Sequence, residues 1–173
     1  IINLSSHISK CDFLDSMPEL KKSIEEIINN SILQEKEETG KLLVSISSFS
    51  YKNGIPEDNS GNGGGFVFDC RSLANPGRYV EYKKSTGMDQ DVIDFFADKT
   101  DMANFLNHVY SIIDNAVETY SGRGFTNLMV NFGCTGGQHR SVFSAENLTR
   151  HLLEKFDVSI NVNHQEQNVS KSF

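Results

Sequence analysis

The sequence predicts an α/β fold, a layered sandwich in which helices flank a small, mostly parallel sheet of about four strands. Short apolar runs alternate along the chain with longer segments of helical periodicity, as is typical of such folds. One of these runs, Leu128 to Phe132, passes through a glycine-rich turn directly into a helix. No internal repeat or coiled-coil register favours another architecture.

Composition restricts the class of protein. The 173 residues suffice for one domain, or for one domain with an appended segment. The formal net charge of -7 does not favour binding to phosphate backbones or anionic membranes. The cysteines, Cys11, Cys70 and Cys134, are odd in number and form no C-x-x-C pair, so we expect no zinc or other metal site and no disulfide framework. No run approaches the ~20 apolar residues of a membrane span, and a cytoplasmic location fits best.

The first 40 residues are expected to be a helical segment or a linker. Ser16 and Glu19 frame Pro18 as a helix start, and the residues from Pro18 to Glu38 have the periodicity of an amphipathic helix. This helix is either a layer of the domain or the last part of a missing N-terminal domain. Because the chain begins without Met, we expect a piece of a longer protein with a fused N-terminal domain, and the domain itself at residues 41–173.

Two predicted strands come before the main helices. The first lies over residues 43–46, and the loop at its carboxyl end carries Lys52, at the edge where open α/β sheets bind ligands. The second, over residues 66–71, ends with Asp69 and Arg71. These two side chains are either a structural ion pair or part of a ligand site.

Loops and helices fill the middle of the chain. Residues 57–65 form a glycine-rich loop that lacks the Lys-Ser/Thr ending of a phosphate-binding loop. Residues 72–89 are an irregular segment, in which Asn75-Pro76-Gly77 is a turn. Helices are predicted over residues 88–98 and 101–124. The segment before them carries the cations Arg78, Lys83 and Lys84, and the longer helix is expected to bury Phe105, Val109, Ile112, Ile113, Ala116 and Val117.

The glycine-rich turn is the one place where the sequence indicates a binding site. A buried strand ends near Gly133, and helical periodicity begins near Gln138. A strand that leads through such a turn into a helix aims several backbone N–H groups and the positive end of the helix dipole at one point, which favours an anion. His139, Arg140 and Ser141 can add side-chain hydrogen bonds to that anion.

Periodicity also assigns the elements around this turn. The helix that follows is expected to bury Val142, Ala145, Leu148, Leu152 and Leu153. A last strand is predicted over residues 158–162.

One interpretation of the turn is enzymatic. Residues 134–141 satisfy C-x-x-G-x-x-R-S, which resembles the phosphate loop of cysteine-dependent phosphatases. In such a loop Cys134 would attack phosphorus as a thiolate while Arg140 holds the phosphoryl oxygens. The general acid would be Asp69 or Asp89. Gly133 stands where that pattern usually has a histidine, which argues against this interpretation.

A longer set of motifs favours a binding domain without catalytic activity. GCTGGQHRSV, together with FSYKNGIP, FDCRSLANPGR and STGMD, resembles the C-terminal domain of the bacterial RapZ (YvcJ-like) RNase adaptor family over residues 43–164. The resemblance implies a phosphosugar sensor that binds glucosamine 6-phosphate through this turn, needs no cofactor, and in enterobacteria presents small RNAs to RNase E. It also implies that nucleotides bind to a different, N-terminal domain.

The resemblance assigns the ligand to two groups of residues. It places the anion on Cys134, Thr135, Gly136, Gly137, Gln138, His139, Arg140 and Ser141. It places Asn131, Lys52, Arg71 and Asn75 at the rim of the site. Cys134 is then a contact of the ligand and not a nucleophile.

The sequence departs from the family pattern at two points. Gly77 follows Asn-Pro where members commonly carry a histidine that touches the ligand, so the recognised sugar can differ. The C-terminus keeps His164 but lacks the basic tail that supports RNA binding. RNA binding, which would use Arg78, Lys83 and Lys84, is therefore a weaker expectation than phosphosugar binding. A homo-oligomer is compatible with the sequence.

Overall fold

A computed structural model describes residues 20, 22–24 and 40–173. Residues Lys41–Phe173 form one compact unit built on a five-stranded sheet with the order β2-β3-β1-β4-β5. The strands are β1 (Leu43–Ser50), β2 (Phe66–Asp69), β3 (Asn127–Cys134), β4 (Ser159–His164) and β5 (Val169–Ser172). The predicted α/β class with a mostly parallel sheet is confirmed, because only β5 runs antiparallel to its neighbour.

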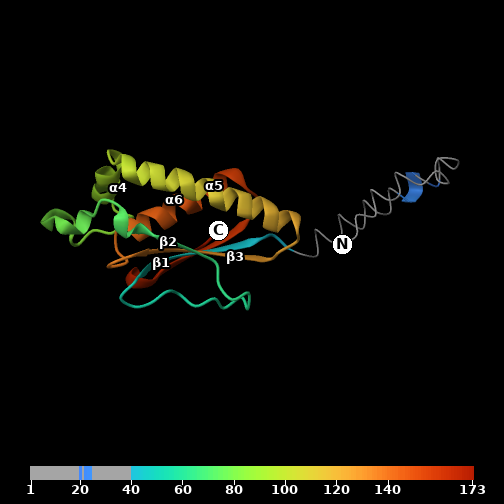
Figure 1. Ribbon diagram of the computed structural model, residues 1–173, viewed down its shortest axis with the longest axis horizontal. Helices are drawn as coiled ribbons and strands as arrows, with labels where there is room; N and C mark the ends of the chain where they lie inside the picture. Colours follow the sequence, from blue (N-terminus) through green and yellow to red (C-terminus); the bar gives the residue numbers. More distant parts are fainter. Residues whose placement is uncertain (1–19, 21, 25–39) are drawn as a thin grey trace. The chain divides into compact units, whose positions relative to one another are not determined.

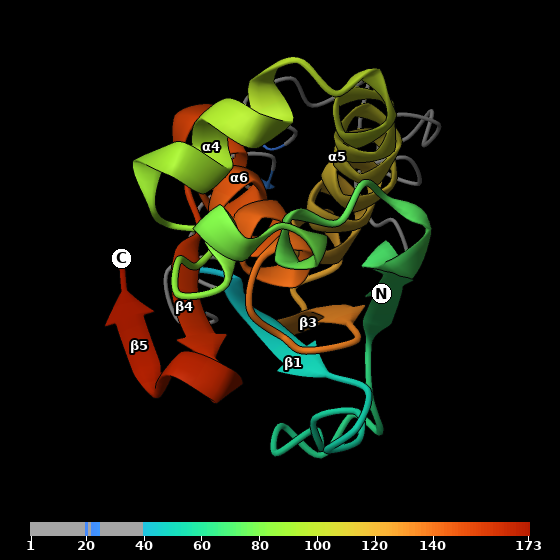
Figure 2. The ribbon, with the colours of Figure 1, turned by 90° about the vertical axis from the view of Figure 1, so that its left-hand side faces the viewer.

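Helices cover one face of this sheet, and the β1–β2 loop lies over the other (Figures 1 and 2). The helices are α4 (Gln90–Ala97), α5 (Thr100–Gly122) and α6 (Arg140–Lys155), and none of the described helices is long and apolar enough to cross a membrane. Short 3-10 turns are η1 (Cys70–Ser72), η2 (Pro76–Arg78), η3 (Val80–Tyr82) and η4 (Gln165–Gln167). Of the predicted N-terminal helix, residues 20 and 22–24 are helical, and the rest lies outside the described residues.

The register of the sheet brings three strand ends together. In the parallel pairs, Ser50 of β1 lies beside Cys134 of β3, and Asp69 of β2 lies beside Gly133. The polypeptide segments that leave β1, β2 and β3 therefore start from the same edge of the sheet. This edge is where ligands bind in open parallel sheets.

The core lies between the sheet and the helices. Alternate residues of the three central strands point into it and are fully or almost fully buried, because successive side chains of a strand face opposite sides. These residues are Val44, Ile46, Leu128, Val130, Phe132, Ile160 and Val162. At 25 cal/mol per Å² of apolar surface, burial of one such side chain contributes about 1.5 to 3 kcal/mol.

The structure corrects three predictions. The strand over residues 158–162 is not the last, since β5 follows η4 and pairs with β4. The second strand ends at Asp69 and not at Arg71, because the chain turns there into η1. Ile112 and Leu153 are exposed, at 46% and 41% of their surface. Each directly follows or precedes a buried residue, and neighbouring positions on a helix point about 100° apart.

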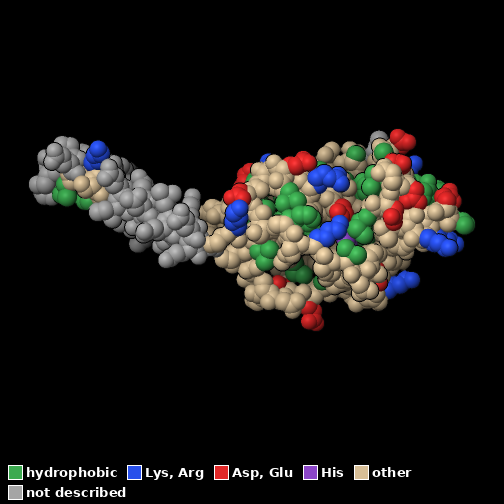
Figure 3. Space-filling model, turned by 180° about the vertical axis from the view of Figure 1, so that it is seen from behind, with side chains coloured by type: hydrophobic (Ala, Val, Ile, Leu, Met, Phe, Trp, Pro, Cys, Tyr) green, Lys and Arg blue, Asp and Glu red, His purple; other side chains and the backbone are tan. Residues whose placement is uncertain are grey.

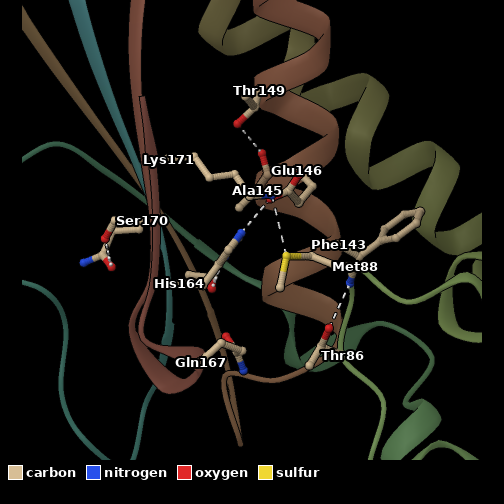
Figure 4. A network of polar contacts seen from close by, with 12 residues as sticks. Thr86, Met88, Phe143, Ala145, Glu146, Thr149, His164, Gln167, Ser170 and Lys171 are labelled. Carbon is tan, nitrogen blue, oxygen red and sulfur yellow. Dashed lines mark hydrogen bonds and ion pairs between the residues drawn. The ribbon is translucent and has the colours of Figure 1, made fainter. Parts of the chain in front are cut away.

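A polar network joins α6 to the C-terminal strands (Figure 4). The buried His164 donates from Nε2 to Glu146 Oε1 at 2.8 Å, and Lys171 Nζ donates to the same oxygen at 2.6 Å. On its other side, His164 Nδ1 lies 2.8 Å from Ser48 Oγ. The hydrogen bond from His164, followed by Lys171, lowers the pKa of Glu146 from 4.5 to about 2, although partial burial opposes this shift.

This network predicts a pH dependence of stability. A carboxylate whose pKa is lowered by folding stabilises the native state above its unfolded pKa, and this contribution is lost as the pH falls through the folded pKa. We therefore expect Glu146 to contribute on the order of 2 kcal/mol at pH 7, lost between about pH 5 and pH 2. Urea unfolding at pH 7 and pH 3 measures this, and Glu146→Gln should reduce the difference between the two pH values. Glu154 lies on the exposed side of α6, and Glu154→Gln should leave the difference in stability between pH 7 and pH 3 unchanged. If the two substitutions changed this difference equally, Glu146 would not be its source.

Candidate anion-binding site

Two glycines are required where β3 leads into α6, Gly133 near the end of the strand and Gly137 in the turn that follows. Gly137 has φ +61°, in the left-handed region, and a Cβ there would lie 2.3 Å from Glu166 Cγ and 2.9 Å from Ser50 N. The rings of Phe49 and Tyr51 pack against Gly133, and a Cβ at this position would lie 2.5 Å from the nearest atom of each ring. Only glycine fits at either position without movement of the neighbours.

The turn leaves a row of backbone donors without partners. Within the described part of the chain, no acceptor bonds the N–H groups of Gly136 to Ser141. The residue before α6, His139, makes no side-chain cap hydrogen bond to the helix. These donors and the positive end of the α6 dipole together form the kind of site that binds phosphate.

Arg140, the first residue of α6, is a buried cation. Only 5% of its surface is exposed. Its Nη1 donates to the carbonyl oxygens of Arg71 at 2.8 Å and Leu73 at 3.3 Å, while its Nε has no hydrogen-bond partner. No carboxylate of the described residues forms an ion pair with it. A buried charge without a counter-ion is costly unless a ligand supplies the opposite charge.

A pocket of about 240 Å³ opens at this point. It is lined by Asn75, Gly77, Lys83, Cys134, Thr135, Gly136, Gln138, His139 and Arg140. Seven of the twelve residues that the sequence assigned to the ligand therefore meet here. The sequence named Gly77 only as a departure from the family pattern, and Lys83 only as an RNA contact. Periodicity could not place either residue at the pocket, since the segment from 72 to 89 is irregular.

The segment that carries Lys83 is fastened to the glycine turn. The Gln138 side-chain amide donates to the carbonyl oxygens of Lys83 at 2.9 Å and Ser85 at 2.7 Å. The Gly87 N–H donates to the Gln138 carbonyl at 2.9 Å, and His139 Nε2 donates to the Tyr82 carbonyl at 2.8 Å. The side chains of Gln138 and His139 therefore hold the rim of the pocket in place.

Five of the residues predicted to bind the ligand do not line the pocket. Gly137 packs on Glu166, and Ser141 is fully buried with its Oγ 3.2 Å from Cys134 Sγ. Asn131 is buried within the sheet, where it hydrogen-bonds Ser47 Oγ and the Phe66 carbonyl. Lys52 and Arg71 are exposed on the neighbouring loops.

Arg71 and Asp69 form an ion pair. The sequence left open whether these side chains form a structural ion pair or part of a ligand site, and the structure shows the ion pair. Arg71 Nη2 lies 2.6 Å from Asp69 Oδ2, its Nε bonds both carboxylate oxygens at 3.0 Å, and its guanidinium stacks 4.1 Å from the Tyr51 ring centre. The side-chain hydrogen bond from Arg71 lowers the pKa of Asp69. Asp69 is therefore ionised at neutral pH. The other candidate acid, Asp89, accepts hydrogen bonds from Thr86 and does not line the pocket.

The two described cysteines lie in different surroundings. Cys70 is fully buried, and desolvation raises the pKa of its thiol to about 12, which makes it unreactive. Cys134 lines the pocket with 3% of its surface exposed and contacts the hydroxyl of Ser141. In residues 20, 22–24 and 40–173, no group of three His, Cys, Asp or Glu side chains could hold a metal ion.

Comparison with known proteins connects this chain to one family. The model of the RapZ C-terminal domain matches residues 42–168. A nucleotide-binding protein of Fervidobacterium nodosum is 35% identical over 79% of this chain and 46% of its own length. One from Finegoldia magna is 33% identical over 95% of this chain and 60% of its own length. One from Staphylococcus aureus strain JH9 is 33% identical over 78% of this chain and 43% of its own length. The chain thus spans about half the length of these relatives.

Proposed function

This chain belongs to the RapZ C-terminal domain family, and on that premise we propose that it binds the phosphate group of a small molecule and does not turn it over. The observation that carries the proposal is Arg140, a buried guanidinium with an unpartnered Nε beside a pocket. A phosphate would supply the missing charge, and the free N–H groups of the turn would bond its oxygens.

The role that fits such a site is that of a ligand sensor in a larger regulatory protein. The family resemblance implies a phosphosugar, with glucosamine 6-phosphate as the first candidate. The relatives are named nucleotide-binding proteins, but they are about twice as long as the matched region. We assign nucleotide binding to the part of those proteins outside the match, because this chain has no Lys-Ser/Thr phosphate-binding loop.

Thermal unfolding in the presence of ligands tests this function. Inorganic phosphate, glucose 6-phosphate and glucosamine 6-phosphate should each raise the midpoint of unfolding in a saturable way, as expected of a ligand that binds only the native state. Potassium chloride at the same ionic strength is the control. If none of the three phosphates raised the midpoint above the chloride control, the proposed function would be wrong.

A cysteine-dependent phosphatase is the second candidate, because Cys134 and Arg140 line the same pocket. Two features oppose it. Asp69, a candidate general acid, is ionised and paired with Arg71, and the histidine that the phosphatase pattern usually has at position 133 would collide with Phe49 and Tyr51. We expect no hydrolysis of p-nitrophenyl phosphate, and phosphate binding by Cys134→Ser within about threefold of the wild type, since N–H groups hold the anion. Phosphoester turnover that disappears in Cys134→Ser would establish the phosphatase instead.

RNA binding remains a weaker proposal. On the face drawn in Figure 3, Lys and Arg side chains are interspersed with Asp and Glu and do not form one continuous basic patch. Because affinity for RNA depends on neutralising several phosphates, this arrangement and the net charge of -7 favour a small ligand. Salt-dependent RNA binding that is lost when Arg78, Lys83 and Lys84 are neutralised would support the adaptor role.

The proposal also extends to the organisation of the whole protein. We propose that residues 41–173 are the ligand-binding domain and that residues 1–40 connect it to a fused N-terminal domain in a cytoplasmic regulator. The length of the relatives supports a further domain, since the matched region covers 43% to 60% of them. A homo-oligomer is compatible with this arrangement.

A further inference from the structure

The two nitrogens of the His139 ring have different surroundings. Nε2 lies 2.8 Å from the carbonyl oxygen of Tyr82, and because a carbonyl can only accept, Nε2 carries the hydrogen of this bond. A neutral imidazole has a single N–H group, so the lone pair of the neutral ring lies on Nδ1. The hydrogen bond to Tyr82 therefore makes Nδ1 an acceptor.

Nδ1 is an unbonded atom in a mostly buried ring. His139 lines the pocket with 7% of its surface exposed. In the part of the chain that the structure describes, the fully buried side-chain nitrogen and oxygen atoms without a partner are Arg140 Nε and Gln167 Oε1. Nδ1 also has no partner there but is not one of these sealed atoms, so it can be reached from the pocket.

Gly77 leaves a space beside this edge of the ring. A Cβ at position 77 would lie 3.4 Å from Cε1 and 3.5 Å from Nδ1 of His139, and 3.4 Å from Asn75 Oδ1. All three residues line the pocket. The Gly77 N–H donates to Asn75 Oδ1 at 3.2 Å, which orients the amide and leaves this oxygen a second lone pair. Two acceptors therefore border the space that a side chain at position 77 would fill.

The pocket thus offers both donors and acceptors. The backbone N–H groups of Gly136 and Gln138 and the guanidinium of Arg140 suit phosphate oxygens. Asn75 Oδ1 and His139 Nδ1 would repel such oxygens, and they suit a group that donates, such as a hydroxyl or an ammonium group. A ligand that satisfies both sets of groups carries a phosphate and a hydrogen-bond donor in one molecule.

We infer that Asn75 Oδ1 and His139 Nδ1 form an acceptor subsite, which binds a hydroxyl or ammonium group of a phosphate monoester. The inference rests on the proposed phosphate-binding function and specifies the rest of the ligand. Gly77, one of the two departures from the family pattern, opens this subsite, because any larger residue would place its Cβ against the two acceptors.

Calorimetric titration with ligands that differ in their donors tests the subsite. At pH 7.5 methyl phosphate is mainly a dianion without a donor, whereas glucose 6-phosphate and glucosamine 6-phosphate carry hydroxyl groups, and the second also an amine. We expect both sugar phosphates to bind about threefold to tenfold more tightly than methyl phosphate, as one neutral hydrogen bond provides. Tighter binding of the amino sugar identifies the amine as the bound donor, and equal binding of the two sugars identifies a hydroxyl. Methyl phosphate that binds as tightly as both sugar phosphates would overturn the inference.

Gly77→Ala should close the acceptor subsite. Its Cβ would make ordinary van der Waals contacts with His139 and Asn75, so the substitution fits the fold while it covers both acceptors. We expect the preference for glucose 6-phosphate over methyl phosphate to fall toward one. Gly122→Ala, whose Cβ meets no atom within 4 Å and which does not line the pocket, should keep the wild-type preference. A folded Gly77→Ala protein that kept the preference, or an equal loss in Gly122→Ala, would contradict the assignment.

The ring nitrogens of His139 report the hydrogen bond directly. Long-range ¹H–¹⁵N NMR at pH 7.5 shows which nitrogen carries the hydrogen. We expect it on Nε2 in the free protein, and we expect the Nδ1 resonance to move with glucose 6-phosphate more than with methyl phosphate. A hydrogen on Nδ1 in the free protein, or equal changes with the two ligands, would show that Nδ1 is not the acceptor.

Methyl phosphate and inorganic phosphate distinguish the two levels of the proposal. If they bind and the sugar phosphates bind no more tightly, the acceptor subsite fails and the phosphate-binding function stands. If neither they nor the sugar phosphates bind, both fail.

Discussion

Replacing Arg140 with Ala is expected to weaken the binding of inorganic phosphate by about a hundredfold or more, since each hydrogen bond to a charged group contributes about 1.5 to 3 kcal/mol. Arg140 lines the pocket, its Nη1 is fixed by two backbone carbonyls, and its buried Nε has no hydrogen-bond partner among the described residues. The guanidinium is thus already in position before the ligand arrives, which avoids the cost of ordering it. Titration calorimetry measures the loss.

Two further variants control for damage to the fold. Arg140→Lys keeps the charge but loses the planar fork, so it should bind phosphate with intermediate affinity. Arg150→Ala removes an exposed arginine of the same helix and should bind as the wild type does. Circular dichroism checks that each variant is folded. A folded Arg140→Ala protein with wild-type affinity would show that the anion binds elsewhere.

Replacing Gly87 with Ala is expected to lower the free energy of unfolding by about 2 to 3 kcal/mol, as an overpacked site does. A Cβ at this position would lie 2.3 Å from Phe143 N and 2.4 Å from His139 O, both backbone atoms of the first turn of α6. Backbone atoms cannot rotate away, so the loop or the helix must move. Either movement breaks the hydrogen bond from Gly87 N–H to Gln138 and releases the rim of the pocket.

Gly122→Ala is the matched comparison, because a Cβ there meets no atom within 4 Å. At the end of α5 this change should leave stability unaltered or raise it by up to about 1 kcal/mol, because alanine is the better helix former. Urea unfolding measures both variants. The proposed packing of Gly87 on α6 would be wrong if the two substitutions had the same effect.

The elements whose apolar residues recur at regular intervals were predicted from the sequence. Val44, Ile46, Val130 and Phe132 repeat every second residue, and each is buried in the sheet. The weak elements were missed, because β5 has only four residues and alternates between intermediate and exposed positions. Its strand structure depends on antiparallel pairing with β4 across η4, and a pattern this short and half-exposed does not indicate that pairing.

The site was predicted in part. The turn from Cys134 to Arg140 was found because its chemistry is contiguous in the sequence, and most of it lines the pocket. The rim of the pocket is formed by the irregular segment of residues 72–89, which folds back onto the glycine turn. The position of Lys83 depends on a hydrogen bond from Gln138, more than fifty residues away in the sequence. Asn131 is flanked by apolar strand residues, and this pattern is the same whether an asparagine is buried in the sheet or lies at the rim of the site. The sequence therefore could not show that Asn131 lies inside the sheet.

The most direct test of the central claim follows the backbone N–H groups of the turn. Two-dimensional ¹H–¹⁵N NMR, with inorganic phosphate titrated against chloride at constant ionic strength, resolves each amide. We expect saturable shifts at Gly136, Gln138, His139 and Arg140, whose backbone N–H groups have no partner in the described residues and which line the pocket. Amides of this turn that stay unmoved, or that move as much in chloride as in phosphate, would contradict phosphate binding at the N-terminus of α6.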